Sequence, residues 1–62
     1  MFEIGDEIII TVDDKSPLES FNREVGIVRE ITEDVFGHPL YDVEVDGSHI
    51  MCFENEMQVK GE

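Results

Sequence analysis

The chain has 62 residues and carries 16 Asp and Glu against four Lys and Arg, which gives a formal net charge of −12. This charge opposes both compaction and approach to a phosphate backbone, so we expect no direct binding to nucleic acid. The length allows one small core, and we interpret residues 1–62 as a single domain with a thin stability margin of about 3 to 9 kcal/mol.

The chain has a single cysteine, Cys52. It excludes an internal disulfide, and no run of residues is apolar and long enough for a membrane span or a secretory signal. We therefore expect a protein of the reducing cytoplasm with no membrane contact.

The first predicted strand covers residues 6 to 12. Ile8, Ile10 and Val12 alternate with Ile9 and Thr11 in a period of two, and these residue types favour strands. One face of this strand is therefore expected in the core.

A long connection follows the first strand. Ser16, Pro17 and Glu19 match the N-cap, the first helical position and the reciprocal Glu of a capping box. Because no long apolar periodicity follows, we predict one short helical turn that Leu18 and Phe21 anchor onto the core.

The stretch "FNREVGIVREITED", residues 21 to 34, fits either a helix or a strand. Its apolar spacing permits one helical face, but Gly26 costs about 1 kcal/mol relative to Ala inside a helix. Its β-branched residues are stiff at χ1 and favour a strand. We predict a strand in which Gly26 marks a tight bend or the close approach of another backbone.

The rest of the chain reads as a turn and three short strands. "VFGHPL" predicts the turn, and in "YDVEV" the residues Tyr41, Val43 and Val45 are expected to face inward. The Asp46–Gly47 pair is a strong hairpin signal that leads into "HIMCF", and "ENE" predicts one more turn before the closing strand "MQVK". Five short strands suggest a closed or nearly closed barrel without bare edges.

"EIGDEIIIT", "FNREVGIVREI", "YDVEVDG" and "CFENEMQV" together resemble the SH3-like small barrels of the KOW and Tudor type. Gly5, Asp6, Gly26, Val28 and Ile31 carry the likeness. The resemblance implies an all-β, five-stranded SH3-like barrel with one short helical turn in the long loop after strand 1. Such barrels bind nucleic acids, peptides and protein subunits alike, so the likeness does not select a function.

The chain departs from this family in two respects. KOW motifs usually hold a further glycine about three residues before the one matched by Gly26, and Arg23 stands there. Their basic loops are replaced by carboxylates, and the aromatic cage of a methyl-reading Tudor domain needs aromatic residues that the core of this chain requires.

No metal, cofactor or catalytic site is predicted. "DVEVDGSHIMCFE" resembles a calcium loop, but Phe53 stands where the bidentate glutamate should be. His38, His49 and Cys52 are too few for a structural zinc site, and we interpret them as two surface histidines and a buried thiol. No nucleophile with an oriented base is visible, so we expect no enzyme.

An outward row of carboxylates is the main candidate binding feature. Asp42, Glu44 and Asp46 should project from one outer face at intervals of about 6.6 Å. Further carboxylates could lie beside this row, although the register cannot be derived from the sequence: Glu30, Glu33 and Asp34.

We interpret the chain as a small acidic, non-enzymatic protein-binding module that docks on a basic partner protein. A sharper form of this hypothesis is an inhibitor that imitates the phosphates of a nucleic acid. Two alternatives stay open: a nucleic-acid-associated KOW-like barrel acting through Lys15, Arg23 and Arg29, or an acidic surface that is only solvated. The sequence gives neither the partner nor the oligomeric state.

Overall fold

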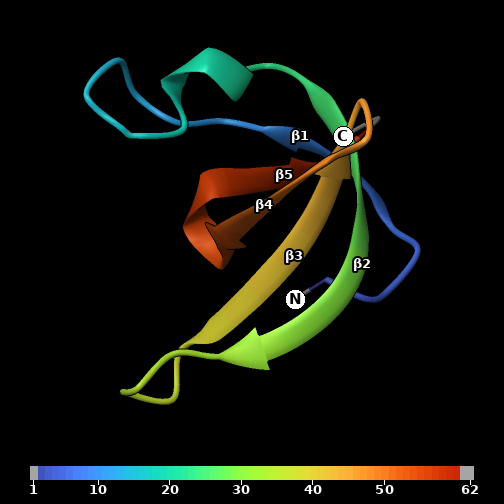
Figure 1. Ribbon diagram of the computed structural model, residues 1–62, viewed down its shortest axis with the longest axis vertical. Helices are drawn as coiled ribbons and strands as arrows, with labels where there is room; N and C mark the ends of the chain where they lie inside the picture. Colours follow the sequence, from blue (N-terminus) through green and yellow to red (C-terminus); the bar gives the residue numbers. More distant parts are fainter. Residues whose placement is uncertain (1, 61–62) are drawn as a thin grey trace.

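Five strands form one antiparallel sheet in the order β4-β3-β2-β1-β5 (Figure 1). This computed structural model describes residues 2–60. The predicted all-β class is confirmed. The elements are β1 (Glu7–Ile10), η1 (Glu19–Phe21), β2 (Val25–Glu33), β3 (Pro39–Val45), β4 (Ser48–Phe53), η2 (Glu54–Glu56) and β5 (Met57–Val59), where η1 and η2 are single 3₁₀ turns.

The first strand is shorter than predicted. β1 ends at Ile10 because the next two backbone N–H groups leave the ladder. The N–H of Thr11 donates to the carbonyl of Glu56 (2.8 Å), and that of Val12 donates to the side-chain oxygen of Asn22 (3.0 Å). Ile8 and Ile10 are fully buried as expected, whereas Val12 is only partly buried against the core.

The helical turn in the long connection is present, but its predicted cap is wrong. The turn is a 3₁₀ segment preceded by Leu18, and no side chain caps it. The Ser16 hydroxyl instead accepts the N–H of Leu18 at 3.1 Å, which is a local turn that competes with helix capping. Leu18 and Phe21 pack against the core, as predicted.

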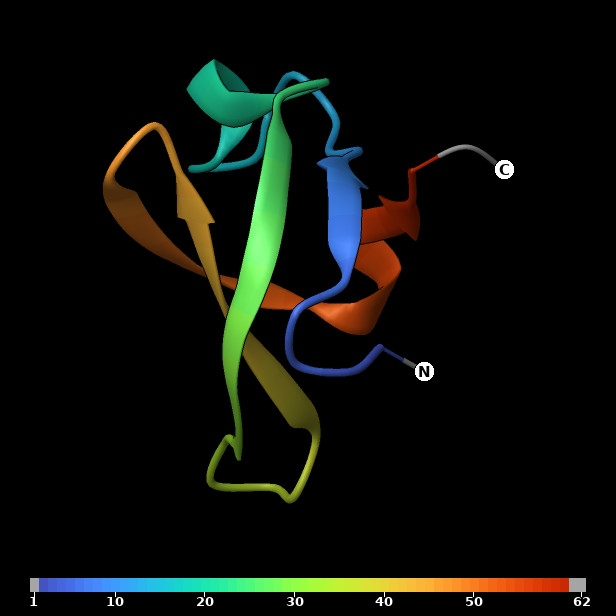
Figure 2. The ribbon, with the colours of Figure 1, turned by 90° about the vertical axis from the view of Figure 1, so that its right-hand side faces the viewer.

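The stretch around Gly26 is a strand, as predicted. β2 is the longest strand and runs the full height of the molecule in Figure 2. Gly26 is buried between β1 and β3, where an added Cβ would lie 2.5 Å from Val43 Cγ1 and 3.0 Å from the Glu44 carbonyl oxygen. The glycine therefore marks the close approach of a neighbouring strand.

β2 contains a β-bulge where it pairs with β3. Val28 lies opposite Val43, but the next partner of Asp42 is Glu30, so Arg29 is the extra residue. The hairpin from β3 to β4 forms at Asp46 and Gly47, as predicted, with φ of 50° and 82°. These left-handed values suit the tight two-residue turn that a twisted hairpin needs.

The core lies on the inner side of the bent sheet, and the inward residues predicted for β3 are buried there. The buried hydrophobic residues are Phe2, Ile8, Ile10, Val28, Tyr41, Val43, Val45, Ile50, Cys52 and Met57. The sheet itself is not closed, because β4 and β5 are its two ends and no ladder joins them across residues 2–60. The expectation of a barrel without edges is corrected accordingly.

Candidate protein-binding surface

Three of the six predicted carboxylates meet on the outer side of the sheet. Glu30 lies directly opposite Asp42, and Asp42 lies opposite Met51. Glu44 is two residues along β3 from Asp42 and lies opposite His49. Because directly opposed residues of antiparallel strands share a face, these side chains form one patch, which we call the outer face.

Two side chains, one guanidinium and one imidazole, contact carboxylates of the outer face. Arg29 Nε lies 2.8 Å from Glu44 Oε1, and both side chains are partly exposed. His49 Nδ1 lies 3.0 Å from Asp42 Oδ1 across the β3–β4 ladder. The sequence made Arg29 a candidate for contact with nucleic acid. In the structure its guanidinium pairs with the Glu44 carboxylate instead. No ion pair within residues 2–60 engages the carboxylate of Glu30, which leaves it as the uncompensated charge of the patch.

The other three predicted carboxylates lie elsewhere. Asp46 is in the β3–β4 turn, beyond the end of β3. Glu33 ends β2 opposite Pro39, and the two-residue alternation from Glu30 places it away from the outer face. Asp34 begins the β2–β3 turn. The predicted row is therefore a patch of three carboxylates, with the remaining ones at the two ends of the hairpins.

Asp34 organises the β2–β3 turn. Its Oδ1 accepts the backbone N–H groups of His38 (2.9 Å) and Phe36 (2.8 Å), and its Oδ2 lies 3.1 Å from His38 Nδ1. The N–H bond from His38 is the main reason that the pKa of Asp34 lies below its ordinary value. The turn is consequently held in one conformation by a charged acceptor.

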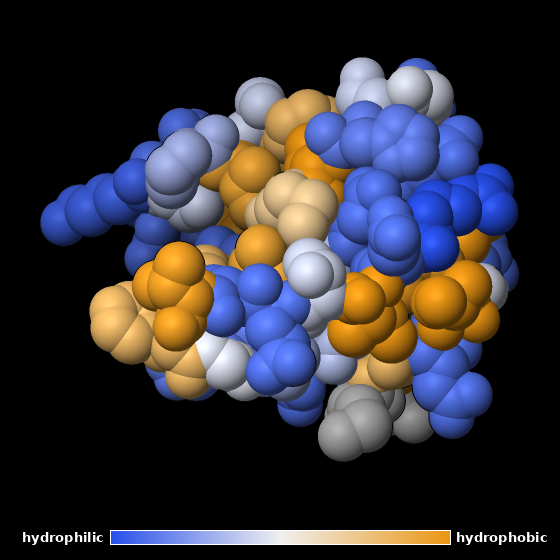
Figure 3. Space-filling view, turned by 60° about the horizontal axis from the view of Figure 1, so that its bottom comes forward, coloured by the Kyte–Doolittle hydropathy of each residue, from blue (hydrophilic) through white to orange (hydrophobic). Residues whose placement is uncertain are grey.

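The β2–β3 turn, which the sequence predicted only as a turn, also exposes large apolar side chains. Val35 and Phe36 are 92% and 81% exposed. Met51 and Phe53 on β4 are also exposed. Figure 3 looks toward the end that carries the β2–β3 turn and shows apolar patches separated by hydrophilic side chains. Two adjacent large apolar residues inside a turn sequence were the signal that could have identified this feature.

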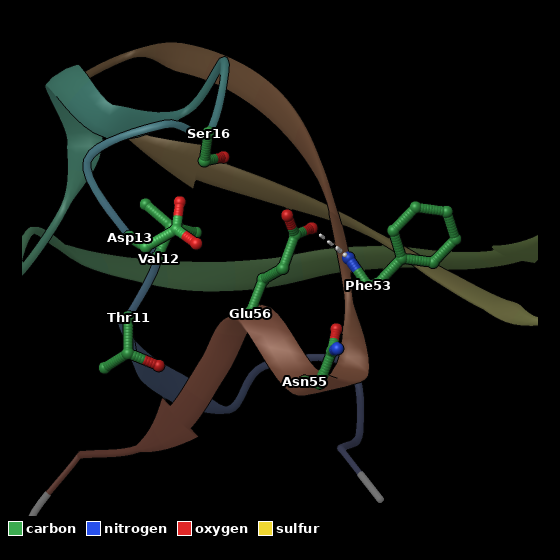
Figure 4. A pocket seen from close by; sticks show the side chains of 7 residues that line it. All are labelled: Thr11, Val12, Asp13, Ser16, Phe53, Asn55 and Glu56. Carbon is green, nitrogen blue, oxygen red and sulfur yellow. Dashed lines mark hydrogen bonds between the residues drawn. The ribbon is translucent and has the colours of Figure 1, made fainter.

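A polar cavity of about 370 Å³ lies between the segment after β1 and η2. The carboxylates of Asp13 and Glu56 point into it from opposite sides (Figure 4). Glu56 Oε1 accepts the N–H of Phe53 at 2.8 Å, and Asp13 Oδ1 accepts that of Lys15 at 3.0 Å. Both acids therefore hold backbone groups in place, as loop-organising carboxylates do.

The residues weighed as metal ligands do not come together. His38 is exposed in the β2–β3 turn and His49 is exposed on β4, whereas Cys52 is fully buried. Burial raises the pKa of the Cys52 thiol to about 11, so it stays neutral at physiological pH. Within residues 2–60 no group of His, Cys, Asp or Glu side chains is arranged to hold a metal ion.

Comparison with known proteins identifies no relative: no family model, curated protein or solved structure matches the chain. Across residues 2–60, no helix has the length and apolar character needed to cross a membrane.

Proposed function

We propose that this protein is a small acidic, non-enzymatic binding module whose outer face docks on a basic surface of a partner protein. The observation that carries the proposal is the register that gathers Glu30, Asp42 and Glu44 on one side of the sheet. In a chain of net charge −12, these groups give a directional negative field that speeds encounter with a positive surface and disfavours wrong partners. An inhibitor that occupies the phosphate-binding surface of a nucleic-acid-binding protein is the sharper form of this proposal.

We also infer that the fold is an SH3-like small barrel of the KOW or Tudor type. The residues that carry the resemblance support this inference because they bond to one another. The N–H of Gly5 donates to the Val28 carbonyl at 2.7 Å, and the N–H of Val28 donates to the Asp6 carbonyl at 3.0 Å. A reducing cytoplasm suits a chain whose one cysteine, Cys52, is a buried free thiol.

The test compares two variants that lose the same charge at different places. Glu30→Gln, Asp42→Asn and Glu44→Gln together neutralise the outer face, while Asp14→Asn, Glu19→Gln and Glu24→Gln neutralise three exposed carboxylates of the long loop. Each variant and the parent protein serve as bait at low salt, and circular dichroism confirms folding. We expect basic proteins to be retained by the parent protein and the loop variant, and to be lost from the outer-face variant.

The association rate with a purified partner gives the sharper measurement. Loss of steering charges should slow association and flatten its salt dependence, whereas loss of packing would chiefly speed dissociation. Equal behaviour of the two variants would show that only total charge matters. If only the loop variant lost binding, the result would contradict the outer face as the site and would place the binding site in the long loop, where binding residues often gather.

A further inference from the structure

A small apolar hollow lies on the inner side of the β2–β3 hairpin, at the end that carries the turn. Its volume is about 220 Å³, below the range of about 300 to 1,000 Å³ that is usual for small-molecule sites. A hollow of this size suits one large side chain. The residues that line it are Phe2, Ile31, Thr32, Glu33, Gly37, Pro39 and Tyr41.

The floor of the hollow is rigid. Phe2 and Tyr41 are buried and meet edge to face, with ring centroids 5.5 Å apart. The Tyr41 hydroxyl donates to Glu54 Oε1 at 3.2 Å, which fixes the ring from its far end. A partner side chain would therefore enter a preformed site and would lose little free energy to rearrangement of this protein.

The wall and rim of the hollow combine apolar surface with negative charge. Ile31 is 41% exposed although its partner across the ladder, Tyr41, is buried, so part of the Ile31 side chain remains available for contact. Glu33 contributes an exposed carboxylate, and no ion pair among residues 2–60 engages it. The adjoining turn, which Asp34 holds in place, exposes Val35 and Phe36.

We propose that this hollow is the anchor site for a partner segment in which a large aliphatic or aromatic side chain is flanked by Lys or Arg. The apolar side chain fills the hollow against Ile31 and Tyr41, and a flanking cation pairs with Glu33. This inference rests on the proposed function, which supplies the basic partner, and it adds the apolar contact that charge alone does not give. A few buried anchors of this kind usually carry most of the binding energy of an interface.

Charge selects this occupant over the other candidates for an exposed apolar site. A second copy of the chain would bring the same carboxylates, Glu33 and Asp34, toward each other and add another charge of −12. An anionic lipid surface would meet the same repulsion. A basic protein segment satisfies both the apolar hollow and its negative rim.

Three synthetic peptides serve as probes for the anchor site. They are Ac-Lys-Leu-Lys-Leu-Lys-amide, its counterpart with serine in place of leucine, and its counterpart with glutamate in place of lysine. Each is titrated into the ¹⁵N-labelled full chain and followed by amide chemical shifts. We expect the lysine–leucine peptide to shift the amides of Ile31, Gly37 and Tyr41 and to bind at least about tenfold more tightly than the serine peptide.

Variants of β2 locate the contact. Ile31→Thr keeps a strand-favouring residue and removes apolar surface, and Val25→Thr makes a comparable change at a residue of similar exposure, 42%, at the other end of the same strand. We expect Ile31→Thr to weaken the lysine–leucine peptide about tenfold and Val25→Thr to leave it unchanged. Glu33→Gln alters only an exposed side chain, so it tests the site even if Ile31→Thr unfolds, and it should weaken the same peptide and flatten its salt dependence.

The outcomes separate this inference from the proposed function. Equal affinity for the leucine and serine peptides, with shifts confined to the outer face, would overturn the anchor site and leave docking by charge intact. Failure of both lysine peptides to bind would overturn both proposals. Tight binding of the glutamate peptide, or self-association that Ile31→Thr abolishes, would also contradict the anchor site, in favour of an uncharged ligand or a second copy.

Discussion

At the scale of single residues, Gly26 is the glycine within residues 2–60 that leaves the least room for a side chain. An added Cβ would lie 2.5 Å from Val43 Cγ1, 2.8 Å from Val45 Cγ2 and 3.0 Å from a backbone oxygen. Real Cβ atoms do not approach so closely, so the neighbouring strand must shift. We expect Gly26→Ala to destabilise the protein by about 1 to 3 kcal/mol, the usual effect of overpacking a core. Chemical denaturation of the purified variant measures this change.

A double variant tests the cause. If the clash with the Val43 side chain dominates, Gly26→Ala combined with Val43→Ala should be more stable than the sum of the two single effects predicts, by at least about 0.5 kcal/mol. Strict additivity would instead assign the effect to the backbone contact. A near-neutral Gly26→Ala would contradict the close packing of β2 against β3.

Arg23 has a backbone conformation that is more usual for glycine. It stands where KOW motifs usually hold a glycine, and its backbone has a φ of 70°, in the left-handed region. Its N–H donates to the Ile10 carbonyl at 2.7 Å, so the loop must return to β1 at this residue. The conformation that glycine would adopt freely is retained by an arginine, because the hydrogen bond to β1 fixes it.

At the scale of elements, strand identity was predictable and strand register was not. Alternation in "YDVEV" predicted correctly that Tyr41, Val43 and Val45 face the core, because only one face of this strand is buried. The bulge at Arg29 has no comparable signal. Without it, continuation of the Val28–Val43 register would pair Glu30 with Tyr41 on the inner side. The extra residue is what places Glu30 on the outer face and Glu33 beside the hollow.

The errors in the first third of the chain also have physical causes. The alternation in "IIITV" continues beyond the end of β1. The strand ends earlier because the N–H of Val12 donates to the side chain of Asn22 and not to a neighbouring strand. Ser16 matches an N-cap but closes a local turn. The first case was decided by a hydrogen bond between Val12 and Asn22, ten residues apart, which the local pattern does not show. The second was decided by a choice between two local hydrogen bonds of one serine hydroxyl, which the residue types alone do not resolve.

The β2–β3 turn should respond to acid, because Asp34 accepts two backbone N–H groups. Its pKa in the folded protein lies below the ordinary value of 3.8, mainly through the His38 N–H. Stabilisation by this carboxylate is therefore complete above pH 3.8 and is lost as the pH falls through the lower folded value. We expect hydrogen exchange of the Phe36 and His38 amides to lose protection in that acidic range.

Two substitutions separate charge from hydrogen bonding in this turn. Asp34→Asn retains an acceptor oxygen and should retain part of the protection at neutral pH, without the acid-dependent loss. Asp34→Ala removes the acceptor and should reduce the protection of both amides at neutral pH. Unchanged protection in the alanine variant would show that two backbone bonds hold the turn without the side chain: Gly37 N–H to the Asp34 carbonyl, 3.1 Å, and Asp34 N–H to the His38 carbonyl, 3.0 Å.

At the scale of the whole molecule, the excess of negative charge is largely uncompensated. Among residues 2–60, Lys and Arg form ion pairs only between Arg29 and Glu44 and, more loosely at 3.7 Å, between Lys60 and Glu7. Both pairs are exposed, and such pairs contribute about 0 to 1 kcal/mol each. The remaining carboxylates repel one another on a molecule whose extents are only 26 × 26 × 24 Å.

We therefore expect sodium chloride to stabilise the fold. The Debye length falls from about 30 Å at 0.01 M, longer than the molecule, to about 3 Å at 1 M, so salt removes repulsion across the whole surface. Thermal unfolding at about 10 mM and about 500 mM sodium chloride is the measurement. A gain of about 1 kcal/mol would raise the melting temperature by about 4 to 8 °C for a domain of this size. Chloride is preferred because sulfate also strengthens apolar burial.

The loop and outer-face variants make this prediction specific. Each variant reduces the net negative charge from −12 to −9, because three carboxylates become amides. In the outer-face variant, two of these carboxylates already have partners, Arg29 and His49, whereas the loop carboxylates Asp14, Glu19 and Glu24 have none within residues 2–60. Removing unpaired charge relieves more repulsion, so the loop variant should gain more stability at low salt and lose more of its salt dependence. A larger gain in the outer-face variant would contradict this expectation, and it would mean that Arg29 and His49 leave the carboxylates of that patch largely uncompensated.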